Sequence, residues 1–227
     1  MLDASALPNP PRARGAHTFT LLAVLVGFPL TVSLFGGELI GALQAAGGRG
    51  WLGFMGAMVG LQWLLFALVR TTQRAGGEHL ADLGLLAPTR GDKIFVGTTL
   101  VALAGFVLFV GDSSMDRVVN GPWVIPRTMI EKLWMLVVSL TAAICEETLF
   151  RGYALIQLRR RGMPMVVAVI VSAISFTMIH GLAQAPVLLA FRAAVGLAFC
   201  ALVLWRGNLR AAVITHFLVD ASLVISV

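Results

Sequence analysis

The sequence predicts an all-α fold, a polytopic membrane helix bundle with about seven transmembrane helices. Two numbers and one pattern support this fold class. Of the 227 residues, 58% are hydrophobic and only 12% are charged, whereas soluble domains have about 25% charged residues. The hydrophobic residues form runs of about the 20 residues that a helix needs to cross a bilayer. These features exclude a soluble enzyme, a disordered tail and a secreted disulfide scaffold.

Seven apolar runs are the predicted membrane spans. They lie at about residues 18–36, 51–69, 94–111, 133–150, 165–183, 186–204 and 209–226. The first run follows a proline-rich start that carries Arg12 and Arg14. We therefore predict a retained helix there, with a cleaved signal peptide as the alternative.

The distribution of basic residues sets the predicted orientation. Twelve Lys and Arg residues fall on the side of the amino terminus and four on the other side. Because cytoplasmic loops are enriched in Lys and Arg, the amino terminus is predicted to be cytoplasmic. The net charge of +6 does not indicate a nucleic-acid partner, since no basic face is interleaved with aromatic residues. The strong preference for Arg over Lys is typical of a GC-rich bacterial genome, so we expect a bacterial inner membrane.

Charged residues in the fourth run are the first sign of a functional site. Glu146, Glu147 and Arg151 lie in its last third, and a charge near the centre of a membrane helix costs about 2.5 to 3.5 kcal/mol. Glu147 and Arg151 are four residues apart, so they share a helix face and can form an ion pair. Glu146 points about 100° away. The alternative is that these acids only mark the helix end at the headgroups.

The fifth and seventh runs carry two further polar pairs with helical spacing. Phe176 and His180 are four residues apart in the fifth run, and His216 and Asp220 are four apart in the seventh. Each pair alone fits a histidine that is hydrogen-bonded within its own helix. Since ionisable groups in membranes face the bundle interior or a wet cavity, we expect the three helices to converge on one polar chamber.

Carboxylates and imidazoles without an evident nucleophilic serine or cysteine favour the activation of water. The two cysteines, Cys145 and Cys200, lie inside apolar runs as small hydrophobic residues. A desolvated glutamate can act as a general base, and a histidine can stabilise the developing oxyanion. The residues thus favour amide hydrolysis within the membrane. The alternatives are a proton-coupled transporter and a non-catalytic membrane protein such as a bacteriocin immunity or assembly protein.

The three motifs resemble a known family in their order and spacing. E-E-T-L-F-R, F-T-M-I-H and H-F-L-V-D are similar to the motifs of the CPBP intramembrane proteases, the CAAX-protease and bacteriocin-processing or Abi family. That family is related to the type II CAAX prenyl endopeptidases. The resemblance covers about residues 130–225 and implies a catalytic domain there, preceded by about three transmembrane helices and loops in residues 1–129. It also implies a conical polar active-site cavity.

The resemblance also assigns roles to residues. It implies four catalytic residues, which are Glu146, His180, His216 and Asp220. It implies four supporting residues, which are Glu147, Arg151, Phe176 and Asn208, the last within a G-N-L segment that is similar to the family. In this comparison Glu146 activates the water with His180, whereas His216 and Asp220 form the oxyanion pocket.

One departure and one open cofactor question accompany the resemblance. Asp220 stands where the prenyl endopeptidases usually have asparagine, and an ionised aspartate only accepts hydrogen bonds. It can orient His216 but cannot itself stabilise an oxyanion. Glu147, His180 and His216 are candidate ligands for Zn²⁺. The sequence lacks H-E-x-x-H, so we favour a site without a metal. The expected partners are the lipid bilayer and a peptide or membrane-protein substrate, which the sequence does not identify.

The spans as drawn place His180 at a different depth from Glu146. His180 lies about 23 Å along the fifth helix, toward its far end. We expect the R-R-R-G-M-P connector between the fourth and fifth helices to be raised above the bilayer, which would bring the two side chains to one level.

Overall fold

The computed structural model describes residues 13–45, 48–84, 126, 128–182 and 186–225. All regular structure in these ranges is helical. The helices are α1 (Arg14–Leu22), η1 (Ala23–Gly27), α2 (Phe28–Gln44), α3 (Gly48–Ala75), η2 (Leu80–Leu83), α6 (Met129–Glu146), η3 (Glu147–Ala154), α7 (Leu155–Arg160), α8 (Met165–Met178), α9 (Pro186–Arg206) and α10 (Arg210–Ile225). Of these, η1 and η3 are π-helices and η2 is a 3₁₀-helix.

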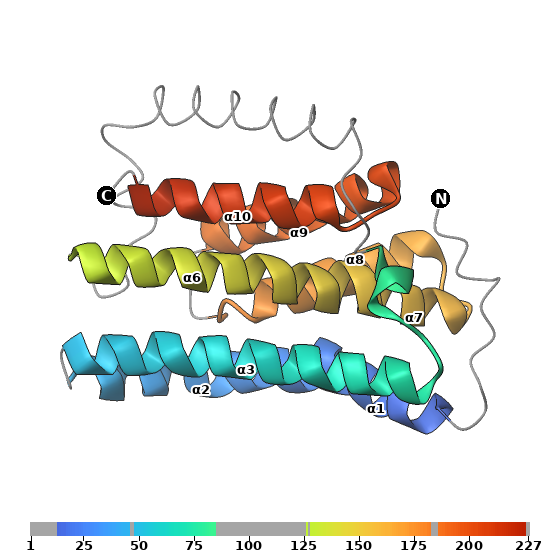
Figure 1. The fold of residues 1–227 in the computed structure, drawn as a ribbon, viewed down its shortest axis with the longest axis horizontal. Helices are drawn as coiled ribbons and strands as arrows, with labels where there is room; N and C mark the ends of the chain where they lie inside the picture. Colours follow the sequence, from blue (N-terminus) through green and yellow to red (C-terminus); the bar gives the residue numbers. More distant parts are fainter. Residues whose placement is uncertain (1–12, 46–47, 85–125, 127, 183–185, 226–227) are drawn as a thin grey trace.

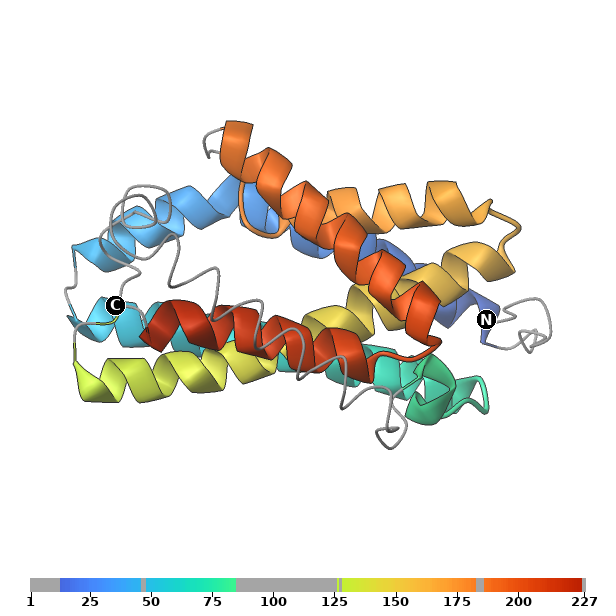
Figure 2. The ribbon, with the colours of Figure 1, turned by 90° about the horizontal axis from the view of Figure 1, so that it is seen from above.

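The helices lie along the long axis of the molecule in three layers (Figure 1). α1, α2 and α3 form one layer, α6, α7 and α8 the middle layer, and α9 and α10 the third. α6 packs against α3 on one side and α10 on the other, while α8 packs against α9. Seen from above, α9 and α10 diverge from the turn that joins them (Figure 2). The middle layer is therefore enclosed by helices from both ends of the sequence.

Among the described residues, four segments are long and apolar enough to cross a membrane. They are Arg14–Leu39, Gly50–Ala75, Met129–Arg160 and Pro186–Arg206, and Met165–Met178 is a shorter apolar helix. Many large apolar side chains point outward, among them Phe19, Leu64, Ile130, Phe191 and Trp205. A bilayer would cover such a surface, which is far too apolar for water. The prediction of an all-α bundle with membrane-spanning helices is therefore confirmed. The predicted run at 94–111 lies outside the described residues, so the count of seven helices stays a prediction.

The helix of the fourth run is longer than predicted. The run was expected to end near residue 150, but the helix continues as η3 and α7 to Arg160. In the sequence, the charged residues of this segment indicate the end of a membrane span. In the structure, every residue of η3 is buried inside the protein. The fifth helix is shorter than predicted, because it ends at Met178 and is followed by Gly181 at a φ of +84°, a conformation that favours glycine.

The extra length of this helix brings the motifs to one level. Glu146 lies 14 residues before Arg160, and His180 lies 15 residues after Met165. At 1.5 Å per residue both are about 21 to 23 Å from the connector between α7 and α8. The two side chains are thus brought to one level by a helix boundary that differs from the predicted one. The position of the R-R-R-G-M-P connector above the bilayer stays a prediction.

Candidate active site

The buried ion pair of Glu147 and Arg151 lies at the centre of the site. Arg151 Nη1 donates to Glu147 Oε1 at 2.9 Å, and both side chains are 0% exposed. The Arg151 guanidinium also lies 3.9 Å from the ring centroid of Phe176, and its Nη2 donates to the carbonyl of Gly196 at 3.4 Å. The predicted pair is present, and it connects η3 to α8 and α9.

His216 of α10 joins this pair. Its Nδ1 lies 2.9 Å from Glu147 Oε1, and since a carboxylate only accepts, Nδ1–H is the donor. Nε2 then faces Asp220 Oδ2 at 3.5 Å and Glu146 Oε2 at 4.0 Å. The imidazole stacks on Phe199 with a centroid distance of 5.1 Å. Glu147 therefore makes the shorter contact with His216, while Asp220, assigned to orient it, lies beside the other ring nitrogen.

Glu146 is held by a residue that sequence reasoning missed. Gln62 Nε2, on α3, donates to Glu146 Oε1 at 2.8 Å. The Glu146 side chain is buried, and its Oε2 has no hydrogen-bond partner among the described residues. One carboxylate oxygen is thus fixed and the other faces His216. A glutamine inside an apolar run was the signal for Gln62, since a polar side chain in a membrane span needs a partner.

Phe176 lies close to the rings of both histidines. Its ring centroid is 4.9 Å from that of His180 and 6.2 Å from that of His216. His180 Nδ1 lies 2.9 Å from the carbonyl oxygen of Phe176. A carbonyl only accepts, so Nδ1–H donates and a neutral His180 keeps its lone pair on Nε2. The predicted contact between Phe176 and His180 is present, although His180 lies beyond the end of α8.

A second missed residue, Arg192, lies on α9. A Cβ added at Gly196 would lie 3.2 Å from the Phe176 ring, so α8 and α9 approach closely there. The two helices run in opposite directions (Figure 2). One turn before Gly196 on α9 is Arg192, and one turn after Phe176 is His180, so Arg192 and His180 lie at matching levels.

The charge of Arg192 acts on the candidate catalytic groups. The guanidinium attracts the carboxylates of Glu146 and Asp220, and it repels the protonated form of His180. An arginine in the middle of an apolar run was the signal that could have identified it, because a charge in a membrane helix usually serves function.

Asn208 lies at the turn between α9 and α10. Its Nδ2 donates to the carbonyl of Arg206 at 3.0 Å, and its Oδ1 accepts from the backbone N–H of Arg210 at 3.1 Å. It lies eight residues before His216, about 12 Å along the helix. Asn208 therefore fixes the start of α10, which positions His216, and it is not gathered with the acids.

The candidate metal ligands have other contacts in the described part of the chain. Glu147 Oε1 faces Arg151 and His216 Nδ1, so these two groups face each other rather than a shared centre. Within the described ranges, no group of three or more His, Cys, Asp or Glu residues is arranged to hold a metal ion. The Zn²⁺ set of Glu147, His180 and His216 stays a prediction.

Comparison with known proteins supports the resemblance. The family model described as type II CAAX prenyl endopeptidase Rce1-like matches residues 129–222. No curated protein and no solved structure matches the chain. The matched segment begins with α6 and includes all three motifs. Residues 129–222 therefore match an Rce1-like domain, which confirms the resemblance to the CAAX proteases that the motifs predicted.

Proposed function

We propose that this chain is an intramembrane endopeptidase that hydrolyses a peptide bond of a membrane-associated peptide or protein. The observation that supports it most is the meeting of Glu146 and His216. Glu146 lies on α6 and His216 on α10, both side chains are buried, and Glu146 Oε2 is 4.0 Å from His216 Nε2. The Rce1-like match gives the reaction class at the level of the family.

Glu146 is the proposed general base. Gln62 holds Oε1, so Oε2 is the oxygen that accepts a proton from the attacking water. A neutral His180 can orient the same water by accepting its second hydrogen at Nε2. The water oxygen attacks the carbonyl carbon, the C–N bond then breaks, and Glu146 returns the proton to the leaving nitrogen.

Stabilisation of the oxyanion is assigned to His216 and Arg192. Because Nδ1–H of His216 donates to Glu147, His216 serves in its imidazolium form, which also has an N–H at Nε2. Because Asp220 only accepts hydrogen bonds when ionised, it cannot donate as an asparagine does. A cationic guanidinium near Glu146 and Asp220 supplies the missing positive charge. Charge that is already in place where the oxyanion develops is worth most where water is excluded.

The bacterial inner membrane and a cytoplasmic amino terminus are part of this proposal. The start of α1 and the ends of α3, α7 and α9 lie at one end of the bundle (Figure 1). At this end Arg160 forms an ion pair with Glu78. The arginine-rich end of α7 therefore contacts the segment that follows α3. Basic residues gathered at one end support the cytoplasmic assignment of that end.

The proposed activity is tested by comparing membrane peptides in cells. Cells with the native chain and cells with Glu146→Ala are analysed by mass spectrometry, and we expect peptides that are absent from the variant. Glu38→Gln, an exposed acid of α2 outside the site, serves as the matched control and keeps them. Identical peptide profiles at equal expression would contradict an endopeptidase, and pH-dependent flux in liposomes would then favour a transporter.

Arg192 gives a separate prediction about the oxyanion. Arg192→Gln is expected to lower kcat by about 10²-fold, as for the loss of one oxyanion donor. In an Asp220→Asn background, where an amide N–H can donate, the same replacement should lower kcat less. The measurement is a double-mutant cycle with a peptide substrate that the mass-spectrometric comparison identifies. Equal losses in both backgrounds would remove Arg192 from this role.

A further inference from the structure

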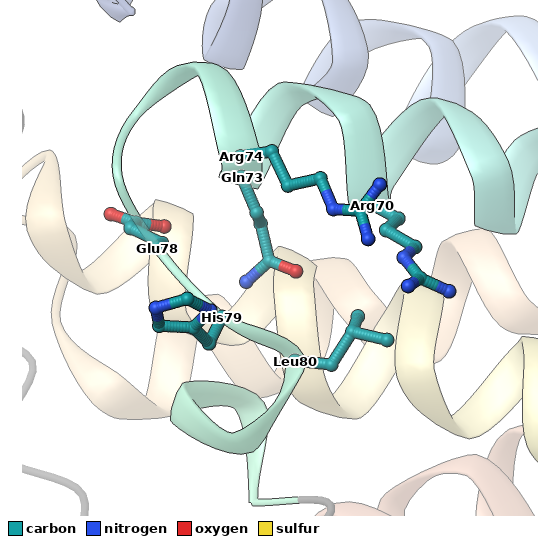
Figure 3. A pocket seen from close by; sticks show the side chains of 6 residues that line it. All are labelled: Arg70, Gln73, Arg74, Glu78, His79 and Leu80. Carbon is teal, nitrogen blue, oxygen red and sulfur yellow. The ribbon is translucent and has the colours of Figure 1, made fainter.

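A small pocket lies at the basic end of the bundle, away from the candidate active site. It has a volume of about 130 Å³ and is lined by Arg70, Gln73, Arg74, Glu78, His79 and Leu80. It lies between the last turns of α3 and η2 (Figure 3). Gln73 is eleven residues beyond Gln62 on α3, about 17 Å farther along the helix. The pocket volume is well above the roughly 10–15 Å³ that a single water needs.

A buried amide with unused hydrogen-bonding capacity points into this pocket. The Gln73 side chain is 1% exposed, and neither its Nε2 nor its Oε1 has a hydrogen-bond partner among the described residues. Figure 3 shows the amide reaching from α3 into the space beside His79 and Leu80. Buried polar groups in folded proteins are nearly always paired. The geometry therefore indicates that a ligand with hydrogen-bonding atoms binds there.

The pocket is positively charged. Arg70 and Arg74 are exposed and one helical turn apart, where like charges repel each other. Within the described part of the chain, neither guanidinium has a hydrogen bond or an ion pair. Glu78 is the only acid among the lining residues, and its carboxylate is paired with Arg160. An anion bound between the two arginines would relieve their repulsion.

We propose that this pocket binds a phosphate group through Arg70, Arg74 and the Gln73 amide. Arginine matches phosphate with parallel N–H donors, and the amide N–H of Gln73 can donate to a further oxygen. The site lies at the end of the candidate span Gly50–Ala75, and the ends of membrane-spanning helices reach the headgroup region. The phosphate comes either from a phospholipid headgroup or from free inorganic phosphate.

The outer face of α3 favours the lipid source. Trp63, Ala67, Arg70 and Arg74 follow one another at spacings of three or four residues, so they lie along one helix face. Trp63 is 41% exposed, and Ala67 is exposed as well. An acyl chain can lie along Trp63 and Ala67 while its headgroup phosphate reaches the two arginines.

Native mass spectrometry of the full chain in dodecyl maltoside tests the site with phosphatidylglycerol as the probe. We expect the native protein to retain one lipid specifically. The double variant Arg70→Gln/Arg74→Gln should bind it at least about tenfold more weakly, the loss expected for a charge-assisted hydrogen bond. Arg14→Gln, an exposed arginine at the same end of the bundle, should leave binding unchanged. Equal retention by the native protein and the double variant would overturn the proposal.

Thermal unfolding separates the two sources of phosphate. If sodium phosphate raises the Tm of the native protein more than sodium chloride does at equal ionic strength, and does not do so in the double variant, the site takes free phosphate. If only phosphatidylglycerol has this effect, the site takes the headgroup. No effect of either probe on the native protein contradicts the site. Neither measurement needs a protease substrate, so this inference and the proposed activity fail independently.

Gln73→Leu tests the amide itself. Leucine has a similar volume and carries no polar atoms, so the variant should have a higher Tm than the native protein when phosphate is absent. The same variant should lose most of the Tm rise that the effective probe gives. A variant with an unchanged response would show that the Gln73 amide does not contact the phosphate, which would overturn its part in the site.

Discussion

Replacing Arg151 by methionine is expected to lower the free energy of unfolding by about 3 to 5 kcal/mol. The replacement leaves Glu147, 0% exposed, without its ion-pair partner, and an uncompensated buried charge costs about that much. It also removes the guanidinium that lies over Phe176 and reaches Gly196 on α9. Urea unfolding in detergent measures the loss.

Two variants show whether the loss comes from the buried charge. In Glu147→Gln/Arg151→Met no charge is left at either position. The amide oxygen of the introduced glutamine can still accept from His216 Nδ1, so most of the stability should return. Arg14→Met, at an exposed arginine at the start of α1, should change the free energy by less than about 0.5 kcal/mol. A double variant as unstable as Arg151→Met would show that packing, and not charge, determines the loss.

The sequence predicted the partners within each helix better than those between helices. Glu147 with Arg151, Phe176 with His180 and His216 with Asp220 each follow from a spacing of four residues, and each is a contact in the structure. Helical spacing fixes such pairs whatever the surroundings. The hydrogen bond between Glu147 and His216 joins residues 69 positions apart, and no local pattern predicts it.

The length of the fourth helix was predicted incorrectly for a related reason. Hydropathy treats Glu147 and Arg151 as the approach to water, so the span was ended near residue 150. In the structure these charges neutralise each other inside the protein, and the chain continues as a buried π-helix and then α7. A π-helix inside an α-helix often marks a functional site. The resemblance began at residue 130 and therefore gave no place to Gln62, which contacts Glu146 from the amino-terminal part.

Glu146→Gln is expected to lower kcat for peptide cleavage by about 10² to 10⁴-fold, the contribution typical of a general base. Glutamine keeps the size of the side chain, and its Oε1 can still accept from Gln62 Nε2. What it loses is the ability to take a proton from water at the position of Oε2. Cleavage of the peptide identified in cells, followed with purified protein in lipid nanodiscs, measures the loss.

Stability separates this catalytic role from a structural one. Glu146 is buried, with one oxygen unpaired among the described residues, so a neutral amide there should leave the Tm unchanged or raise it. Loss of activity together with an undiminished Tm is the result expected of a proton acceptor. Glu38→Gln should keep both, as an exposed acid outside the site. If Glu146→Gln lowers the Tm and kcat together, Glu146 stabilises the bundle and the base must be another residue.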